Sequence, residues 1–468
     1  MLEAIPVSPL IMNLIAINWT GFFLQAGQLL LALSILVILH EFGHYITAKW
    51  FGCRVEKFFL FFDWPIALFK KKFGETTYGV GILPLGGYVK IAGMIDESMD
   101  KTQMNRPAES WEFRSKPAWQ RLIIMLGGII MNVLVAFLLY SLILMIWGDK
   151  SIPTSSMKYG VHVVDSTLYR TGLRNGDRIL YVDGNEIADF QQLRLRTLIG
   201  KELVVERNGE KVNIELPENL LGQLIENRNK RLPGLLEPRV PAQVFFVPDT
   251  SRAYKAGLRN NDLIVKIDSQ HVRFFDEVKN KVLNSRNDTI TVTVNRNNKE
   301  MTFPAFVDSN GILGFIPYLG YEQMDSAGWI KVDVRHYSFF AAFPAGVSKT
   351  FATLRDYIDQ FKVILNPKTG GYKGIGGFKS MGSIFPKYGW DWENFWSITA
   401  FFSVVLAFMN LLPIPALDGG HVLFTLYEIV TQKKPSDKFL EYAQITGMVL
   451  LLGLMLYANG NDWFGWGR

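Results

Sequence analysis

Three residues near the beginning of the chain have the types and the spacing of a metal site. His40, Glu41 and His44 form the pattern H-E-x-x-H. Because positions i and i+4 of a helix share a face, both imidazoles can reach one zinc ion. Glu41 can then act on a zinc-bound water as general base, which is the chemistry of a metal-assisted hydrolase. The alternative is a soluble core helix in which two satisfied histidines form the pattern by chance.

A carboxylate far along the chain can complete this set. Asn410 is followed by Pro413, Pro415 and then Asp418. Two prolines break a helix, and irregular backbone at membrane depth occurs only where it is buried in protein or lines a cavity. Catalytic zinc takes three protein ligands and keeps one position for water, so we predict Asp418 as the third ligand. The alternative is an N-cap for the next helix. His421 is expected to support the site rather than to bind the metal.

The element that must position the two histidines is a long apolar helix. Residues 21–39 are almost entirely apolar and run into the motif without a break. A helix over about 19–50 is long enough to cross a hydrocarbon core of about 30 Å at about 1.5 Å per residue. Ionisable groups are costly in such a helix, which makes them a functional-site hypothesis by default.

Three further apolar stretches predict membrane spans, over about 119–147, 395–412 and 445–457. The lysine- and arginine-rich segment 49–121 is expected to be cytoplasmic by the positive-inside rule, which puts the N-terminus outside. The first and third spans then both run from outside to inside, and each carries its part of the site toward the cytoplasmic end. The two halves of the site can therefore meet at one depth.

The second span contains Gly127, Gly128 and Asn132. Small residues permit close helix packing, and a polar amide within a membrane needs a partner. The sequence leaves two roles open for these residues, helix packing and shaping of the site.

Residues 76–92 alternate in polarity and are punctuated by Pro84, Gly86 and Gly87. This pattern predicts two strands joined by a turn. The bland interpretation is an ordinary hairpin. The sharper one is an open strand edge beside the metal, which pairs with an extended substrate through main-chain hydrogen bonds.

An internal repeat occupies the polar middle of the chain, residues 151–335. The segments that begin at Thr171 and Ala256 align with each other and match Asp177 with Asp262. Their flanks alternate in polarity like strands. Two small, mostly β modules in tandem are the economical explanation.

Residues 347–365 carry apolar side chains at helical spacing, which predicts an amphipathic helix that lies on the membrane surface or packs on the β modules. The glycine-rich stretch 369–383 is expected to be a flexible loop. It follows no strand and has no P-loop lysine pattern, so we do not predict nucleotide binding there.

Charge, cysteine count and the N-terminal residues exclude several classes of protein and of site. The net charge is +6, but the basic residues form no single stripe, and we expect no nucleic-acid partner. Cys53 is the only cysteine, which excludes an internal disulfide and a cysteine-rich metal site. The first residues carry only Glu3 as a charge and lack a basic n-region, so no removable signal peptide is expected.

Together these motifs resemble the site-2 proteases, which are intramembrane zinc metalloproteases, in their bacterial RseP-type subgroup with tandem PDZ domains. The likeness covers essentially the whole chain. It implies Zn²⁺ bound by His40, His44 and Asp418, with Glu41 as catalytic acid/base and Asn410 in substrate positioning or oxyanion stabilisation. It also implies a membrane-associated hairpin that binds substrate through Gly86, Gly87, Tyr88, Val89 and Lys90.

The implied fold is a polytopic α-helical membrane protein with four transmembrane helices, a membrane-associated β-hairpin region and two extracytoplasmic PDZ-like α+β domains. The expected segments are 1–50 with the first helix and the motif, 51–118 as a cytoplasmic β-rich region, 119–148 as the second helix, 149–235 and 236–335 as the PDZ-like domains, 336–390 with the amphipathic helix and loop, 391–430 with the third helix and Asp418, and 431–468 with the fourth helix.

The resemblance implies regulated intramembrane proteolysis in the bacterial inner membrane. The implied substrates are single-pass membrane proteins, either anti-sigma factors already trimmed by a site-1 protease in a stress response, or remnant signal peptides. Neither module displays an obvious Gly-Leu-Gly-Phe loop for a carboxylate, so we expect the modules to exclude untrimmed substrates by size rather than to bind a new C-terminus.

Two other classes compete with the protease. A membrane scaffold would bind peptides through the modules and carry a structural metal, but a structural zinc site is closed by four protein ligands and has no need of Glu41. A metal transporter would distribute ionisable residues along a pathway rather than at one depth.

Overall fold

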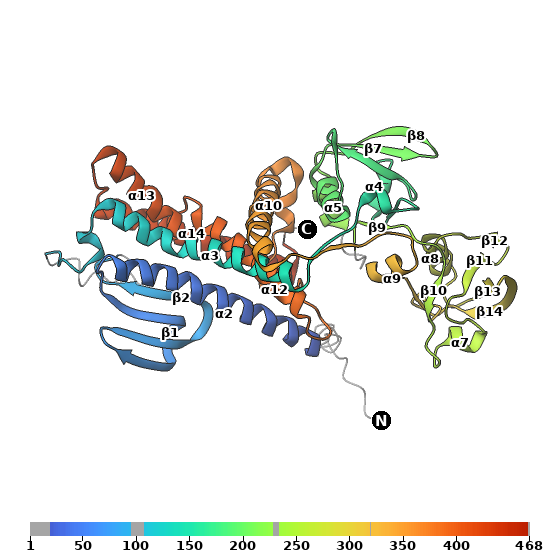
Figure 1. The fold of residues 1–468 in the computed structure, drawn as a ribbon, viewed down its shortest axis with the longest axis horizontal. Helices are drawn as coiled ribbons and strands as arrows, with labels where there is room; N and C mark the ends of the chain where they lie inside the picture. The colour runs from blue at the N-terminus through green and yellow to red at the C-terminus, as the bar shows by residue number, and fades with distance from the viewer. Residues whose placement is uncertain (1–18, 95–106, 228–233, 319, 467–468) are drawn as a thin grey trace, which may run out of the picture. The chain divides into compact units, whose positions relative to one another are not determined.

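The computed structural model describes residues 19–94, 107–227, 234–318 and 320–466 (Figure 1). The non-cytoplasmic lead that the sequence predicts covers residues 1–20, and all but its last two residues lie outside this part of the chain. Contacts divide the chain into two compact units. Unit 1 consists of Met1–Gly148, His336–Lys362 and Ile375–Arg468, and unit 2 consists of Asp149–Arg335 and Val363–Gly374.

Long helices make up most of unit 1. They are α2 (Trp19–Trp50), α3 (Ala118–Ile146), α10 (Phe339–Leu365), α12 (Trp392–Leu411), α13 (Asp418–Thr431) and α14 (Asp437–Phe464). Four of them, α2, α3, α12 and α14, are long and apolar enough to cross a membrane. α14 extends well beyond the predicted span 445–457, because helix formation continues through the polar residues on both sides of the apolar stretch. The short helices η1 (Phe113–Ser115) and α11 (Phe378–Gly382) complete the unit.

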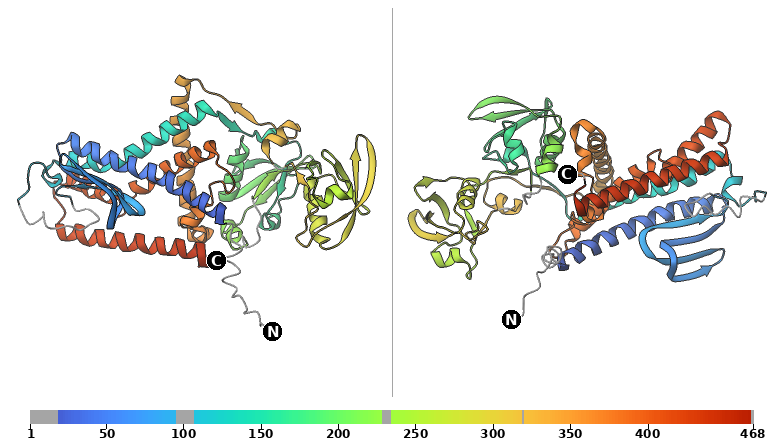
Figure 2. Two further views of the ribbon diagram at one scale, coloured as in Figure 1. Left: turned by 90° about the horizontal axis from the view of Figure 1, so that it is seen from below. Right: turned by 180° about the vertical axis from the view of Figure 1, so that it is seen from behind.

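α2 and α3 lie along each other, and α12 and α13 pack against α3 (Figure 2). The backbones of α2 and α3 touch where Gly43 meets Gly127. A Cβ atom on Gly43 would lie 2.2 Å from the carbonyl oxygen of Gly127. This close approach requires glycine, and it brings α3 directly behind the H-E-x-x-H turn.

β1 (Val55–Phe73) and β2 (Thr76–Ile91) form one sheet beside α2 (Figure 1). The first half of β1 pairs on one side with residues 87–91 and on its other side with residues 77–80. The chain does reverse between residues 83 and 87, but the predicted hairpin is wrong, because the two arms flank β1 instead of pairing with each other. Val55 and Phe59 are buried, as the residues of a central strand should be. Residues 87–91 therefore form an edge of the sheet.

α10 begins at Phe339, eight residues before the predicted start, and continues through Pro344. Ala342, Gly346 and Thr350 form its buried face. Part of that face lies on α3, where a Cβ on Gly346 would meet Ser141. The helix is amphipathic as predicted, and this part of it packs on α3, a helix of membrane-spanning length.

The glycine-rich stretch is not the plain loop that its composition suggests. It contains the turns η3 (Pro367–Thr369) and η4 (Gly371–Gly374) and the helix α11. Thr369 stabilises the first turn, since its hydroxyl donates to the carbonyl oxygens of Val363 and Asn366.

Unit 2 contains two four-stranded sheets with the same order. The first has the order β6-β5-β7-β8 and the second β12-β11-β13-β14. Their strands are β5 (Arg178–Val182), β6 (Asn185–Glu186), β7 (Glu202–Arg207), β8 (Glu210–Glu215), β11 (Leu263–Ile267), β12 (Gln270–His271), β13 (Thr289–Arg296) and β14 (Lys299–Phe306). Each sheet packs its own hydrophobic core.

Shorter elements complete unit 2. They are β3 (Asp149–Ser151), η2 (Thr154–Ser156), β4 (Val161–Val163), α4 (Ser166–Arg170), α5 (Phe190–Ile199), α6 (Leu220–Asn227), β9 (Leu236–Pro238), β10 (Val244–Phe246), α7 (Arg252–Ala256), α8 (Phe275–Asn284), β15 (Ile316–Pro317), α9 (Tyr321–Ser326) and β16 (Asp333–Arg335). β3 pairs with β16, so the two ends of the long segment 149–335 lie side by side.

The two aligned aspartates make the same contacts in the two sheets. Asp177 is buried and accepts two hydrogen bonds from the guanidinium of Arg207. Asp262 is buried and accepts two from Arg296 in the same way. A buried carboxylate must be paired to be tolerated, which is why each module keeps this arginine.

Candidate metal centre

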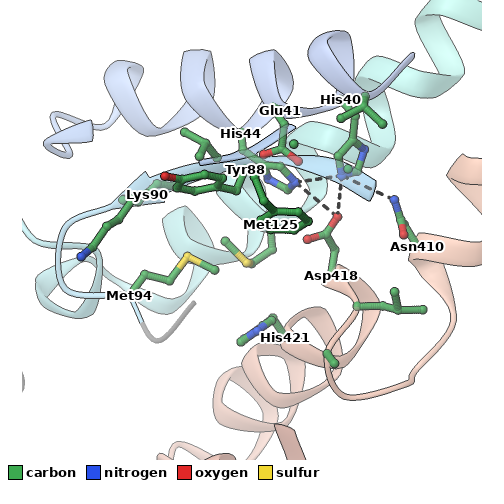
Figure 3. A pocket seen from close by; sticks show the side chains of 18 of the residues that line it. His40, Glu41, His44, Tyr88, Lys90, Met94, Met125, Asn410, Asp418 and His421 are labelled. Carbon is green, nitrogen blue, oxygen red and sulfur yellow. Dashed lines mark hydrogen bonds and ion pairs between the residues drawn. The ribbon is translucent and has the colours of Figure 1, made fainter. Parts of the chain in front are cut away.

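The three predicted ligands converge on one point. His40 and His44 lie one turn apart on α2, and Asp418 is the first residue of α13. Oδ2 of Asp418 lies 3.2 Å from Nε2 of His40 and 3.2 Å from Nε2 of His44, and the two Nε2 atoms are 3.3 Å apart (Figure 3). This group could hold a metal ion.

The donor set fits zinc. A tetrahedral zinc ion with bonds of about 2.0–2.1 Å holds its ligand atoms roughly 3.3 Å apart, which matches the spacing of these three atoms. Two imidazoles and one carboxylate are also donors typical of catalytic zinc sites, which keep the fourth position for water. The side chains are 6–19 % exposed, so water reaches the site but does not surround it.

Groups on α3 orient both imidazoles. Nδ1 of His44 donates to the carbonyl oxygen of Ile124 at 2.9 Å, which leaves Nε2 without a proton and able to bind a metal. The amide of Asn132 lies 3.1 Å from Nδ1 of His40. With its Oδ1 turned toward the ring, Asn132 accepts the Nδ1 proton and gives His40 the same tautomer. That oxygen otherwise has no partner among the described residues.

Gly128 forms the floor beneath the imidazoles. A Cβ atom there would lie 2.4 Å from Nε2 of His44 and 2.6 Å from Cε1 of His40. Both roles left open for the second span are therefore present. Gly127 permits close helix packing, and Gly128 and Asn132 shape the site.

Asp418 does not cap its helix. Leu417 is the N-cap residue, and no side chain makes a capping hydrogen bond at this end of α13. The Asp418 carboxylate points toward the two imidazoles instead, as Figure 3 shows. This orientation favours the ligand interpretation over the capping alternative.

The break between α12 and α13 is held by α14. The N–H of Ala416, a residue with φ of +82°, donates to Oε1 of Gln444 at 3.1 Å. A Cβ atom on Gly447 would lie 1.6 Å from the carbonyl oxygen of Pro415. Irregular backbone at this depth is thus tied to the neighbouring helix, as a membrane interior requires.

Glu41 faces the edge of the β sheet. The backbone N–H of Val89 lies near its carboxylate. A Cβ atom on Gly87 would lie 2.8 Å from a methyl group of Val37 and 3.4 Å from Cγ of Glu41. Glycine at position 87 therefore lets the edge approach the helix that carries the metal ligands.

All ten predicted site residues line a single cavity of about 710 Å³. They are His40, Glu41, His44, Gly86, Gly87, Tyr88, Val89, Lys90, Asn410 and Asp418. Nδ2 of Asn410 lies 3.4 Å from Nε2 of His40, so its amide is next to the metal position. His421 lines the same cavity one turn along α13 from Asp418 (Figure 3).

Sequence reasoning missed a polar cluster on the sheet side of the cavity. Nζ of Lys57 donates to Oδ2 of Asp63 at 2.9 Å, and the hydroxyl of Tyr88 donates to Oδ1 of Asp63 at 2.8 Å. Burial raises the pKa of Tyr88 to about 12, so the phenol keeps its proton. The cluster joins β1 to the 87–91 arm of β2. The spacing of these residues in the sequence does not indicate this contact, because it depends on the register of the strands.

Comparisons with known proteins identify relatives that match nearly the whole chain. The model of peptidase family M50 matches residues 28–454. A putative zinc metalloprotease of Xylella fastidiosa is 26% identical over 95% of this chain and 99% of its own length. One of Vibrio cholerae is 27% identical over 92% and 97%. The regulator of sigma-E protease RseP of Escherichia coli is 27% identical over 94% and 99%.

The match extends over nearly all of the chain, including the helices of membrane-spanning length and the position of the metal centre. The alternative of a non-catalytic scaffold is set aside. The protein is a zinc-dependent metalloendopeptidase of the membrane and belongs to peptidase family M50, the site-2 protease family.

Proposed function

We propose that the protein cuts the transmembrane segments of single-pass membrane proteins, with zinc held by His40, His44 and Asp418 and with Glu41 as acid/base. One observation carries this proposal. The donor atoms, a carboxylate and a strand edge line one cavity, and two of the ligands are on a helix of membrane-spanning length.

When bound, zinc supplies a Lewis acid that activates water and polarises the scissile carbonyl. The protein does the rest. The Glu41 carboxylate takes a proton from the attacking water and gives it to the leaving amide nitrogen. The Asn410 amide is placed to stabilise negative charge on the carbonyl oxygen. Asn132 and the Ile124 carbonyl hold the two imidazoles in place throughout.

A helical substrate must unwind before its backbone can be cut, and each exposed backbone group in lipid costs several kcal/mol. We propose that the substrate pairs as an added strand with the edge formed by Gly86, Gly87, Tyr88, Val89 and Lys90. This edge has a ladder partner on one side only, and its other side faces Glu41. Strand addition would therefore deliver the scissile bond to the metal.

The test compares purified wild-type protein with Glu41→Gln on a model single-pass substrate, with zinc content measured in both. The glutamine variant should retain zinc and lose cleavage, because it keeps the shape of the side chain but cannot accept the proton. Equal cleavage by both proteins would reject the assignment of Glu41.

The proposed location is the bacterial inner membrane, with unit 2 on the extracytoplasmic side. The relative named regulator of sigma-E protease supports anti-sigma factors as substrates, cut after a site-1 protease has trimmed them. Remnant signal peptides are the second proposed class. Cleavage of an anti-sigma factor would be a step of regulated intramembrane proteolysis in a stress response.

We further propose that residues 149–235 and 236–335 are tandem PDZ-like domains that exclude untrimmed substrates by size. Support comes from the two sheets of identical strand order and from the equivalent Asp177–Arg207 and Asp262–Arg296 pairs.

One observation favours the rival role of peptide binding. Residues 311–315 read Gly-Ile-Leu-Gly-Phe, and all of them except Gly314 line, together with α8, a cavity of about 480 Å³. Within the described residues, the N–H groups of Leu313 and Gly314 make no hydrogen bond, which suits a carboxylate. Tighter binding of a peptide with a free C-terminus than of its amidated form would support this role, and equal binding would reject it.

A further inference from the structure

The two modules of unit 2 can be compared position by position. The first module carries the sheet β6-β5-β7-β8 and the helix α5, and the second carries β12-β11-β13-β14 and α8. α5 and α8 have the same length and begin at Phe190 and Phe275, which are 85 residues apart, as Asp177 and Asp262 are. Each module also has a two-stranded ladder, β4 with β9 and β10 with β15. The groove between the helix and the second strand of this ladder is therefore equivalent in the two modules.

This groove is open in the second module. α8 and the segment that leads into β15 line the cavity of about 480 Å³, and α8 contributes Phe275, Asp276 and Lys279 to its wall. A peptide that binds as an added strand docks in a groove of this kind. The equivalent groove of the first module should be open as well, unless another part of the chain fills it.

In the first module, α9 fills the groove. Tyr321, the first residue of α9, packs edge to face on the ring of Phe190, with the two centroids 6.4 Å apart. Its hydroxyl lies near the side chains of Gln191 and Arg194 on α5. Burial and the nearby carboxylate of Glu237 on β9 raise the pKa of Tyr321. The three α5 residues around this ring stand at the positions that line the open cavity in the second module.

The residues that follow Tyr321 anchor α9 in the core of the first module. Met324, Trp329 and Ile330 are buried there, although all three come after the strands of the second module in the chain. The backbone is tied as well, since the N–H of Lys158 donates to the carbonyl oxygen of Trp329 at 3.2 Å. α9 is thus a part of the first module that the chain supplies only after the second module is complete.

The same segment begins on the second module. The ring of Tyr318 packs on Phe245 of β10, with the centroids 5.1 Å apart, and its hydroxyl donates to Oδ1 of Asn261 at 3.2 Å. This ring also meets Trp329 at 4.8 Å. Only two residues separate Tyr318 from Tyr321. So short a tether gives a built-in ligand an effective concentration that a free peptide rarely reaches.

A separate set of contacts joins the two modules at α8. Arg239, which follows β9, donates through Nη2 to Oδ2 of Asp276 at 3.0 Å and to Oε1 of Glu277 at 2.8 Å. Asn175 of the first module donates to the same Asp276 carboxylate at 2.6 Å. Domains of one chain are expected to move relative to each other unless their interface is extensive. Two separate contacts, this one and α9, oppose such a movement.

We propose that α9 is a built-in ligand of the first module, which closes its groove and holds the two modules together as one rigid body. The proposal rests on the proposed size exclusion and deepens it, because a filter rejects a bulky substrate only if its parts keep their distance. It also means that the groove of the first module admits no substrate peptide while α9 is in place.

The test measures the distance between the modules directly and requires no proteolysis. In a Cys53→Ser background, Glu210→Cys on β8 and Lys299→Cys on β14 place one spin label on each module of the full chain in lipid nanodiscs. Pulsed dipolar spectroscopy then gives the distribution of distances between the labels. Tyr321→Ser should broaden this distribution severalfold, because it removes the ring that fills the groove. Tyr321→Phe keeps the ring and should leave the distribution narrow.

Two controls accompany this measurement. Glu322→Gln changes an exposed neighbour of Tyr321 on α9 and should leave the distribution unchanged. A second label pair, Glu186→Cys with Glu210→Cys, lies within the first module and should stay narrow in Tyr321→Ser. A narrow distribution between the modules in Tyr321→Ser would overturn the proposal. Broadening of both label pairs alike would overturn it too, because Tyr321 would then support the fold of the module rather than the contact between modules.

Cleavage rates connect this contact to the size filter. Tyr321→Ser should cut untrimmed substrate severalfold faster than the wild type does, and trimmed substrate at the same rate. If the distribution broadens but untrimmed substrate is still rejected, the size filter is wrong and the role of α9 in holding the modules stands. If no variant cuts any substrate, the protease assignment fails, and the distance measurement still decides the role of α9.

Discussion

At the residue scale, the metal centre depends on groups that do not bind the metal. Asn132 and Ile124 set the protonation of the imidazoles, and Gly128 sets the space behind them. Loss of a partner of this kind typically weakens metal binding even though the ligands themselves remain.

Gly128→Ala should weaken zinc binding by roughly 10–100-fold, the usual effect of disturbing groups that orient ligands. The added methyl group would collide with both imidazoles, so the rings or the backbone of α3 would have to shift. Zinc affinity is measured by competition with a chelator. Gly27→Ala on α2, where a Cβ meets nothing within 4 Å, is the control. Equal affinity in both variants would contradict the prediction.

H-E-x-x-H could be predicted because its geometry is local, with two histidines one turn apart on a single helix. The partnership of Asn132 with His40 could not, because it joins residues 92 positions apart and depends on the rotation of α3 against α2. The role of Asp418 could be predicted only in part. The broken helix before it indicated a cavity, but only the fold shows which cavity.

At the element scale, the break between α12 and α13 and the edge of the β sheet deliver the remaining parts of the site. Both segments contain prolines or glycines that interrupt regular structure. In each of them, backbone groups are available to a neighbouring element or to the substrate. The sequence indicated the reversal near Pro84, but it did not show that β1 lies between the arms, because β1 lacks a clear alternation of polarity.

Gly447→Ala should destabilise the protein by about 1–3 kcal/mol, the typical cost of overpacking. The new methyl group would overlap the carbonyl of Pro415, and the resulting shift should move Asp418 and lower activity as well. Gly453→Ala on the same helix, with nothing within 4 Å, should leave both unchanged. Thermal unfolding measures the stability of the two variants, and the rate of substrate cleavage measures their activity. A stable and active Gly447→Ala variant would show that α14 does not hold the break.

Val89→Pro should slow cleavage by about threefold to tenfold, corresponding to the loss of one hydrogen bond worth roughly 0.5–1.5 kcal/mol. Proline removes the N–H that faces Glu41 and the incoming strand, while zinc content should not change. Leu68→Pro lies in the second half of β1 at a position without a ladder partner, and it should have no such effect. Similar rates for both variants would argue against strand addition.

At the scale of the whole molecule, unit 2 is a long insertion in a membrane enzyme. Its ends, Asp149 and Arg335, are paired in β3 and β16. Only two residues separate α3 from β3, and three separate β16 from α10. The polar residues between the apolar spans predicted a separate region in the middle of the chain. The pairing of its two ends could not be predicted, because neither short strand contains a signal that identifies its partner nearly 190 residues away.

Excision of residues 152–332, with a short turn joining β3 to β16, should leave zinc binding intact and permit cleavage of untrimmed substrates. The physical reason is that the metal centre is built entirely from unit 1. The control retains the modules and carries Glu210→Gln, a change at an exposed position at the start of β8. Unchanged rejection of untrimmed substrates by the excised enzyme would refute the gate.

The paired ends of unit 2 also have an evolutionary meaning. Closing a loop costs little more for a long insert than for a short one, provided that its ends already lie together. A gene that acquires, duplicates or loses a module between β3 and β16 therefore keeps the same two-stranded junction and the same membrane enzyme. Recombination at this junction can change what the protease admits while the chemistry that it performs stays the same.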